Sequence, residues 1–263
     1  MQTSEELKNT LKRISGKGYK AYKDIEGAFE FPDQAYTLYI DHVQGDPFAA
    51  PSKLRIIIPQ EISRFPVDTY SNKSREIATR DFVSRLFAGS IYQSRHSHKG
   101  SGKSGMIRID TPGQEILERT SALINEHHLE IRFEVGLPAF GRKIAGQEAQ
   151  EILFSEIPRL VSQSLIFDHI NQEKLFQHIK VNEDADYLRS LLKQHKLVCF
   201  VANDAVLPRK SGVDPRPLSG NEVIPFESPE NYSYTFNLPN KGAINGMGIP
   251  EGVSLIMGGG FHG

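Results

Sequence analysis

Alternation between apolar and polar residues predicts three strands in the first half of the chain. Two β-rich segments start at Tyr36 and Lys53, and Gly, Pro and Asp residues bound both of them. We expect them to pair, with QGDPFAAPS as their connection. A third segment starts at His128 and has one apolar side, formed by Leu129, Ile131, Phe133 and Val135. This pattern is typical of a strand with one buried face.

Apolar residues at helical spacing predict helices in the same half. The first helix covers residues 4–15, where Thr3 and Glu6 have the spacing of a capping box. The second covers residues 74–87, with Ser74 as its N-terminal cap. The expected apolar side of this second helix consists of Ile77, Ala78, Phe82 and Leu86.

The second half of the chain is predicted to begin with two helices, followed by a strand and a segment rich in Pro, Gly and Ser. Residues 145–167 and 172–196 have helical periodicity, and Pro158 should kink or interrupt the first of these helices. The apolar string LVCFVAN then predicts a buried strand that contains Cys199. Residues 204–230 are rich in Pro, Gly and Ser, which is typical of a boundary between domains.

The chain ends in a glycine cluster that follows an apolar run at residues 253–257. The run predicts a buried strand, and Gly258 and Gly263 fall on the two glycine positions of GxxxxGK[ST], a loop whose backbone N–H groups bind phosphate. The sequence ends before the Lys of that motif. A flexible tail is the alternative, because glycines are common in loops. The expected phosphate ligands are the backbone groups of Gly258, Gly259, Gly260, Phe261, His262 and Gly263.

Composition narrows the classes of function. With 31 Lys and Arg against 32 Asp and Glu, the net charge is -1, so any nucleic-acid surface must come from local clustering. A single cysteine excludes an internal disulfide. No apolar signal region or long apolar run occurs, which favours a cytoplasmic protein without a membrane partner. No base is placed to work with the acidic residues, so we assign no catalytic residue and no metal ligand; the acidic residues considered are Glu115, Glu118, Glu130 and Glu134.

An acid-free stretch between Phe82 and Ile109 is the strongest local charge feature. Its five basic residues and one flanking aromatic residue are Arg85, Tyr92, Arg95, Lys99, Lys103 and Arg108. Such a stretch is either a solvated basic loop or a surface for a phosphate backbone, and both interpretations stay open. Arg142 and Lys143 are candidates to extend that surface.

The string GSGKS at residues 100–104 is not expected to be a phosphate-binding loop of the Walker A type. Ser97 stands where the motif needs its first glycine, and no apolar strand precedes the string. The residues after Lys103 predict a strand, whereas a phosphate-binding loop opens a helix.

Longer strings along most of the chain carry a resemblance to a known family. They are YIDHVQGDPFAAPSKLRI, GSGKSGMIRIDTPGQEILERTS, FEVGLPAFGR, AVLPRKSGVD, VIPFESPE and LPNKGAINGMGIPEGVSLIMGGGFHG. Together they resemble the predicted ATPases of the ABC class. The Walker B carboxylate and the signature motif of such ATPases do not occur in this sequence, so this chain by itself should not hydrolyse ATP.

The resemblance implies an α+β (mixed α/β) fold. In it, residues 1–225 form an N-terminal mixed α/β accessory domain, and residues 226–263 form the first strands of an ABC-type P-loop ATPase core that ends inside the Walker A loop. It also implies ATP and Mg²⁺ as cofactors of the whole protein, and it leaves a homodimer through the core open. Tyr234 is the candidate to stack on adenine, with Tyr232 and Phe236 as alternatives.

Three classes of function follow from these patterns. The glycine cluster and the family strings favour the N-terminal region of an ABC-class ATPase that couples hydrolysis to a nucleic acid, RNA rather than DNA, held in single-stranded form by the accessory domain. The acid-free stretch also fits a non-enzymatic nucleic-acid-binding module. A dimerisation module is what remains if that stretch is only solvated.

Overall fold

Seven strands in the first half of the chain form one mixed sheet in the computed structural model, which describes residues 1–93, 100–221, 223–255 and 257–258. The strand order is β1-β2-β3-β4-β7-β5, and β6 pairs with the same edge of β7 as β5. Only β1 and β2 are parallel. The strands are β1 Gln2–Thr3, β2 Gly27–Phe31, β3 Tyr36–His42, β4 Ser52–Pro59, β5 Ile107–Arg108, β6 Ala122–Ile124 and β7 His128–Val135.

Strand alternation gives this sheet one buried and one polar face. On β4, Leu54, Ile56 and Ile58 are buried, whereas Lys53 and Arg55 point to the opposite side. β7 likewise buries all four residues of its predicted apolar side. The predicted strands and the expected pairing of β3 with β4 are therefore confirmed.

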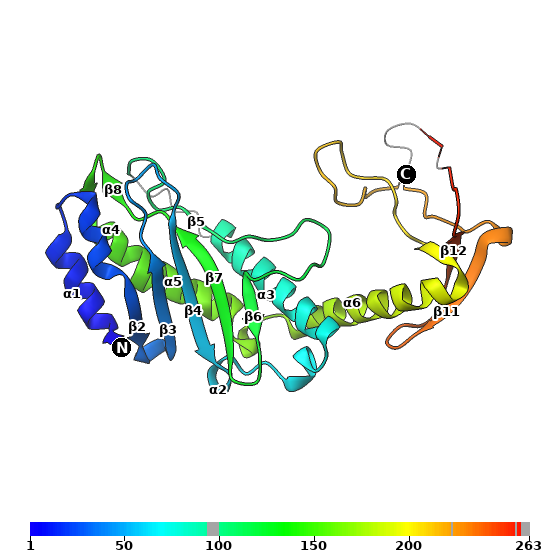
Figure 1. The fold of residues 1–263 in the computed structure, drawn as a ribbon, viewed down its shortest axis with the longest axis horizontal. Helices are drawn as coiled ribbons and strands as arrows, with labels where there is room; N and C mark the ends of the chain where they lie inside the picture. The colour runs from blue at the N-terminus through cyan, green and yellow to red at the C-terminus, as the bar shows by residue number, and fades with distance from the viewer. Residues whose placement is uncertain (94–99, 222, 256, 259–263) are drawn as a thin grey trace. The chain divides into compact units, whose positions relative to one another are not determined.

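Helices cover the buried face, and α4 and α5 run behind the sheet in the view of Figure 1. A short hairpin, formed by β8 and β9, precedes α4. The elements are α1 Ser4–Ile14, η1 Tyr19–Ile25, η2 Pro32–Gln34, α2 Gln60–Ser63, η3 Val67–Tyr70, α3 Lys73–Gln93, β8 Ala139–Phe140, β9 Lys143–Ile144, α4 Gly146–Glu151, η4 Ile152–Glu156, α5 Ile157–Ser164 and η5 Phe167–His169.

The helix ends show which local signals were decisive. The capping box of α1 is present, since Thr3 Oγ1 accepts the Glu6 amide at 3.2 Å while the Glu6 carboxylate accepts the Thr3 amide at 2.7 Å. Such a cap contributes about 1 kcal/mol. The predicted cap of the second helix was wrong: α3 starts one residue earlier than Ser74, and Asn72 Oδ1 accepts the Arg75 amide at 3.0 Å.

The predicted apolar side of α3 was also wrong in part, because only Ala78 of its four residues is buried. The buried surface of α3 is partly polar. Arg80, with a side chain only 6% exposed, donates to Glu76, to Glu118 and to two backbone carbonyls at residues 119 and 122. This arginine attaches the segment before β6 to α3, so the helix buries a wider arc than its apolar residues indicate.

Pro158 interrupts the helical hydrogen-bond ladder as expected. The π-helix η4 separates α4 from α5, and the proline lies in the first turn of α5. Proline has no N–H to donate, so the preceding turn widens rather than continuing the regular ladder.

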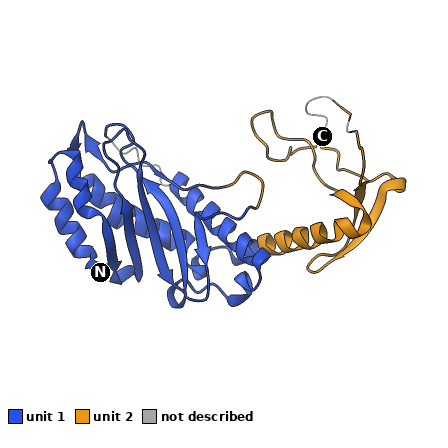
Figure 2. Cartoon of the chain, viewed as in Figure 1, with its two compact units in different colours: residues 1–111, 117–176 blue, residues 112–116, 177–263 orange. Residues whose placement is uncertain are grey.

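The chain divides into two units (Figure 2): unit 1 comprises Met1–Thr111 and Leu117–Phe176, and unit 2 comprises Pro112–Ile116 and Gln177–Gly263. α6 continues from unit 1 into unit 2. The predicted boundary at 225/226 lies inside unit 2, and it stays a prediction about where a nucleotide-binding core begins. The remaining elements are α6 Gln172–Leu192, η6 Lys193–His195, β10 Leu197–Ala202, η7 Glu230–Tyr232, β11 Ser233–Leu238 and β12 Gly242–Pro250.

Unit 2 contains a three-stranded antiparallel sheet in the order β10-β12-β11. Its core consists of three buried residues, Leu197, Phe236 and Leu238, against which leucines of α6 pack. The expectation that Cys199 is buried was wrong, since it is only half-buried and its neighbour Val198 is 59% exposed. β10 is an edge strand of a small sheet, so part of its side chains faces solvent.

The apolar run before the glycine cluster is not a buried strand. Among its described residues, Val253, Leu255 and Met257 are more than 80% exposed and belong to no strand. A strand of this composition needs neighbours on both edges and both faces. No strand in the described part of the chain pairs with it, so the prediction fails within this structure.

Candidate functional site

Ion pairs neutralise part of the acid-free stretch. Arg85 Nε lies 2.7 Å from Oδ2 of the buried Asp81, one helical turn earlier on α3. Arg108 Nε, on β5, lies 2.5 Å from Glu134 Oε2 on β7. The run lacks acids along the sequence, but strands and helix turns bring acids to it in space.

The other predicted nucleic-acid residues are spread over the surface of unit 1. Tyr92 lies near the end of α3 and is 67% exposed. Arg142 and Lys143 are exposed in the hairpin that precedes α4. Arg95 and Lys99 lie outside the described residues.

The GSGKS string forms a tethered turn rather than an open anion loop. The amide of Ser101 donates to the Ala139 carbonyl, that of Lys103 to the Pro47 carbonyl and that of Gly105 to the Gly136 carbonyl, each at 2.8 Å. Ser101, Ser104 and Gly141 are further joined through serine hydroxyls. Amides that are already hydrogen-bonded cannot cradle phosphate, so the structure agrees with the expectation that this string is not a Walker A loop.

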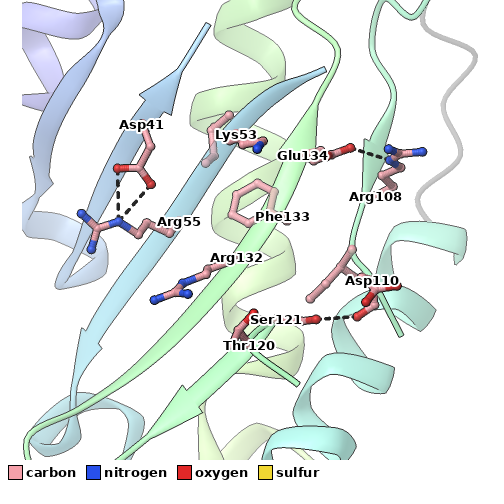
Figure 3. A pocket seen from close by; sticks show the side chains of 12 residues that line it. Asp41, Lys53, Arg55, Arg108, Asp110, Thr120, Ser121, Arg132, Phe133 and Glu134 are labelled. Carbon is pink, nitrogen blue, oxygen red and sulfur yellow. Dashed lines mark hydrogen bonds and ion pairs between the residues drawn. The ribbon is translucent and has the colours of Figure 1, made fainter. Parts of the chain in front are cut away.

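The polar face of the large sheet carries a hollow of about 790 Å³. Figure 3 shows its lining, which comes from β3, β4, β7, the segment around β5 and the segment just before β6. The charged residues that line it are Asp41, Lys53, Arg55, Arg108, Asp110, Arg132 and Glu134.

Strand register places these charges in two rows across the sheet. In one row, Lys53 is the partner of Glu134, which is in turn the partner of Arg108. In the next row, Tyr39, Arg55 and Arg132 lie on β3, β4 and β7, each opposite its neighbour. The side chain of Lys53 makes no ion pair within the part of the chain that the structure describes.

Carboxylates hold the arginines of the second row. Arg55 Nε lies 2.9 Å from Asp41 Oδ2, and its guanidinium stacks 3.9 Å from the centroid of the Tyr39 ring. Arg132 Nε donates to Glu130 Oε1 at 2.6 Å. The Glu130 side chain is only 7% exposed, so it is a buried charge with fixed partners rather than a solvent-facing acid.

Hydrogen bonds fix the rim of the hollow near β6. The Ser121 hydroxyl donates to the Asp110 carbonyl at 2.8 Å, and Arg119 Nη1 lies 2.7 Å from Asp110 Oδ2. On the exposed surface of unit 1, Lys73 donates to Glu118 at 2.5 Å, and this contact lowers the pKa of Glu118 and raises the pKa of Lys73. These groups are paired structurally, and no carboxylate here is left poised as a general base.

Sequence reasoning missed Lys53, Arg55 and Arg132. A signal was present, because each of them lies on the polar side of a predicted strand. What the sequence lacked was the pairing of β4 with β7, which brings residues 53–55 beside residues 132–134.

The aromatic candidates of unit 2 occupy three different environments. Phe236 is buried in the small core, and Tyr234 is half-buried with its ring stacked at 6.4 Å from that of Phe236. The Tyr234 ring also covers Gly248, where any Cβ would overlap it. Tyr232 is 51% exposed. Stacking of Tyr234 on adenine stays a prediction.

Only the first residue of the predicted phosphate loop is described. Gly258 has a φ of +153°, a conformation that favours glycine, which fits the start of such a loop. Residues 259–263 lie outside the described residues. The described ranges contain no cluster of three or more His, Cys, Asp or Glu that could hold a metal, so we assign no Mg²⁺ ligand.

Comparison with family models yields two matches that together cover nearly the whole chain. Residues 4–168 match the model described as the N-terminal region of ATPases of the ABC class, and residues 171–263 match the P-loop domain of ABC ATPases. A comparison with curated proteins finds no match. Among the described helices, none is long and apolar enough to cross a membrane.

Proposed function

Because the chain belongs to the ABC-class ATPases, we propose that it forms the N-terminal region of an enzyme that binds ATP with Mg²⁺ and couples hydrolysis to single-stranded RNA held by unit 1. The match of residues 171–263 to a P-loop domain supports the nucleotide part of this proposal. The cationic hollow on the sheet of unit 1 supports the RNA part.

For the nucleotide, the residues assigned to phosphate are 258–263, through their backbone N–H groups. Bound ATP would supply the phosphoryl group, with Mg²⁺ neutralising its charge. Within this chain, the contribution is binding and orientation of the phosphates, and we assign no catalytic residue to it.

For the nucleic acid, the carrying observation is the gathering of four cations, Lys53, Arg55, Arg108 and Arg132, in one open hollow. A sheet face that presents cations and an aromatic ring can bind phosphates and stack bases without a sequence code. The lining acids keep the local charge low, so we expect few phosphate contacts and a shallow dependence on salt.

The exposed apolar run favours a second candidate, association of the chain with a second copy. Val253, Leu255 and Met257 all face solvent, and exposed apolar patches mark interaction surfaces. Analytical sedimentation of the wild-type protein and of Leu255→Ser tests this candidate. The wild-type protein should self-associate more strongly than the variant.

The RNA part is tested by binding of a short single-stranded RNA of mixed sequence in a salt series. Lys53→Ala removes one phosphate contact and should lower the slope of log K against log salt by about 0.7. Lys20→Ala, an exposed lysine of η1, is the matched control and should leave the slope unchanged. Absence of binding by wild type, or the same slope for both variants, would contradict the proposal.

A further inference from the structure

Two arginines lie directly opposite each other in the polar face of the large sheet. Arg55 on β4 and Arg132 on β7 are register partners, and Figure 3 shows their side chains on the same side of the two strands. Like charges directly opposite each other on neighbouring strands destabilise a sheet. The folded protein nevertheless keeps this pair, so its neighbours must hold it.

Glu130 is the neighbour that holds both arginines. Its Oε1 accepts Arg132 Nε at 2.6 Å, and its Oε2 lies 3.9 Å from Arg55 Nη1. Because the Glu130 side chain is only 7% exposed, a ligand that approaches from solvent meets the guanidinium groups before the carboxylate.

The orientation of Arg55 is fixed from two further sides. Its Nε donates to both carboxylate oxygens of Asp41, at 2.9 and 3.2 Å, and its guanidinium lies over the Tyr39 ring. The terminal Nη groups of Arg55 and Arg132 make no hydrogen bond to the part of the chain that the structure describes. Both arginines line the hollow, and the partners described above fix the orientation of their guanidinium groups.

We propose that Arg55 and Arg132 form a phosphate-binding pair for a backbone phosphate of single-stranded nucleic acid, and that Glu130 is the positioning residue of this pair. The inference rests on the proposed function of unit 1 and assigns its contact. Guanidinium groups match phosphate through parallel hydrogen bonds, which a lysine cannot reproduce.

A repeated anion fits this place better than a single ion. Lys53 lies two residues from Arg55 on β4, about 7 Å along the strand, and it faces the same hollow. Arg108 lies across the sheet from Lys53, with Glu134 between them. A second row of cations beside the arginine pair suits a chain of phosphates.

The first arm of the test measures affinity for a short single-stranded RNA. Arg55→Lys and Arg132→Lys keep the charge but lose the planar fork, so each should weaken binding about tenfold and leave the salt slope nearly unchanged. Arg13→Lys is the matched control, because Arg13 forms an exposed pair with Asp24 on another part of unit 1. Wild-type affinity in both lysine variants would overturn the inference.

The second arm tests the positioning role of Glu130. Glu130→Gln should weaken RNA binding, and combining it with Arg132→Lys should add little, because both changes act on the same contact. A purely structural role would lower the stability of Glu130→Gln but leave the affinity of its folded fraction at the wild-type value. That result would overturn the positioning role.

A third arm does not depend on RNA. Inorganic pyrophosphate is titrated into the wild-type protein while the Nε–Hε signals of the arginines are followed by NMR. If the Arg55 and Arg132 signals shift with pyrophosphate but the protein binds no RNA, the phosphate-binding pair is supported and the proposed RNA function is contradicted. If neither signal shifts, and the wild-type protein and both lysine variants bind RNA with equal affinity, the phosphate-binding pair is contradicted while the proposed RNA function stands.

Discussion

Single buried tyrosines illustrate how burial sets the chemistry of a residue. Tyr19 and Tyr22 donate their hydroxyls to the Leu137 and Pro138 carbonyls at 2.8 and 2.7 Å, whereas the buried Tyr36 hydroxyl has no hydrogen-bond partner among the described residues. Burial raises the pKa of all three tyrosines well above the ordinary value. Each therefore stays protonated in the folded protein at a pH where the unfolded chain ionises.

We predict that the free energy of unfolding decreases as the pH rises above about 10, where unfolded tyrosines lose their protons. The stabilising contribution is fully present below the unfolded pKa and is lost as the pH rises through the folded pKa. Tyr36→Phe should reduce this alkaline loss, and at neutral pH it should cost little because its hydroxyl has no partner. Urea unfolding at a series of pH values measures both effects, and identical pH profiles for the two proteins would contradict the prediction.

At the scale of elements, the GSGKS turn shows how closely backbone segments approach in unit 1. Gly136 follows β7, and a Cβ at that position would overlap the backbone carbonyl oxygen of Lys103. Gly102 has a φ of +61°, and a Cβ there would overlap the Pro47 carbonyl. These glycines therefore serve close packing of the turn, which explains a glycine-rich string without any phosphate.

Gly136→Ala should destabilise unit 1 by about 1 to 3 kcal/mol, because backbone rather than a flexible side chain has to shift. The matched control is Gly89→Ala on α3, where nothing lies within 4 Å of the added Cβ. That control should stabilise the helix by about 0.5 to 1 kcal/mol. Thermal or urea unfolding measures both changes, and equal shifts in the two variants would mean that the turn yields to a Cβ.

At the scale of the whole molecule, the two units differ in how much core they have. Unit 1 buries one face of a seven-stranded sheet under helices, whereas the sheet of unit 2 has a core of three buried residues. Regions with few buried apolar contacts open at lower free energy than the rest of a protein. Unit 2 should therefore unfold at a lower denaturant concentration than unit 1.

Cys199 reports on this difference because it is the only thiol and lies in unit 2. A thiol reagent should label Cys199 in the native protein at a measurable rate. As urea is added, the labelling rate should reach that of the unfolded chain at a lower urea concentration than the one at which the buried tyrosines of unit 1 become exposed. A single shared transition would show that the two units unfold together.

The sequence by itself determined most of the elements and the family. Alternation placed β3, β4 and β7, a capping box placed the start of α1, and the strings around the glycine cluster indicated an ABC-class ATPase. These features depend on residues that are close in the sequence, so local patterns carry them.

Only the tertiary structure decided which charges meet. The pairing of β4 with β7 joins segments that are remote in the sequence, and it brings Arg55 beside Arg132 and places Glu130 next to both. The pairing of β5 with β7 likewise gives Arg108 an acidic partner, Glu134, that a count of charges along the stretch does not include. Ion pairs and hollows depend on distances of a few ångströms between residues that are remote in the sequence. These distances follow from the register in which the strands pair, and a single sequence does not specify that register.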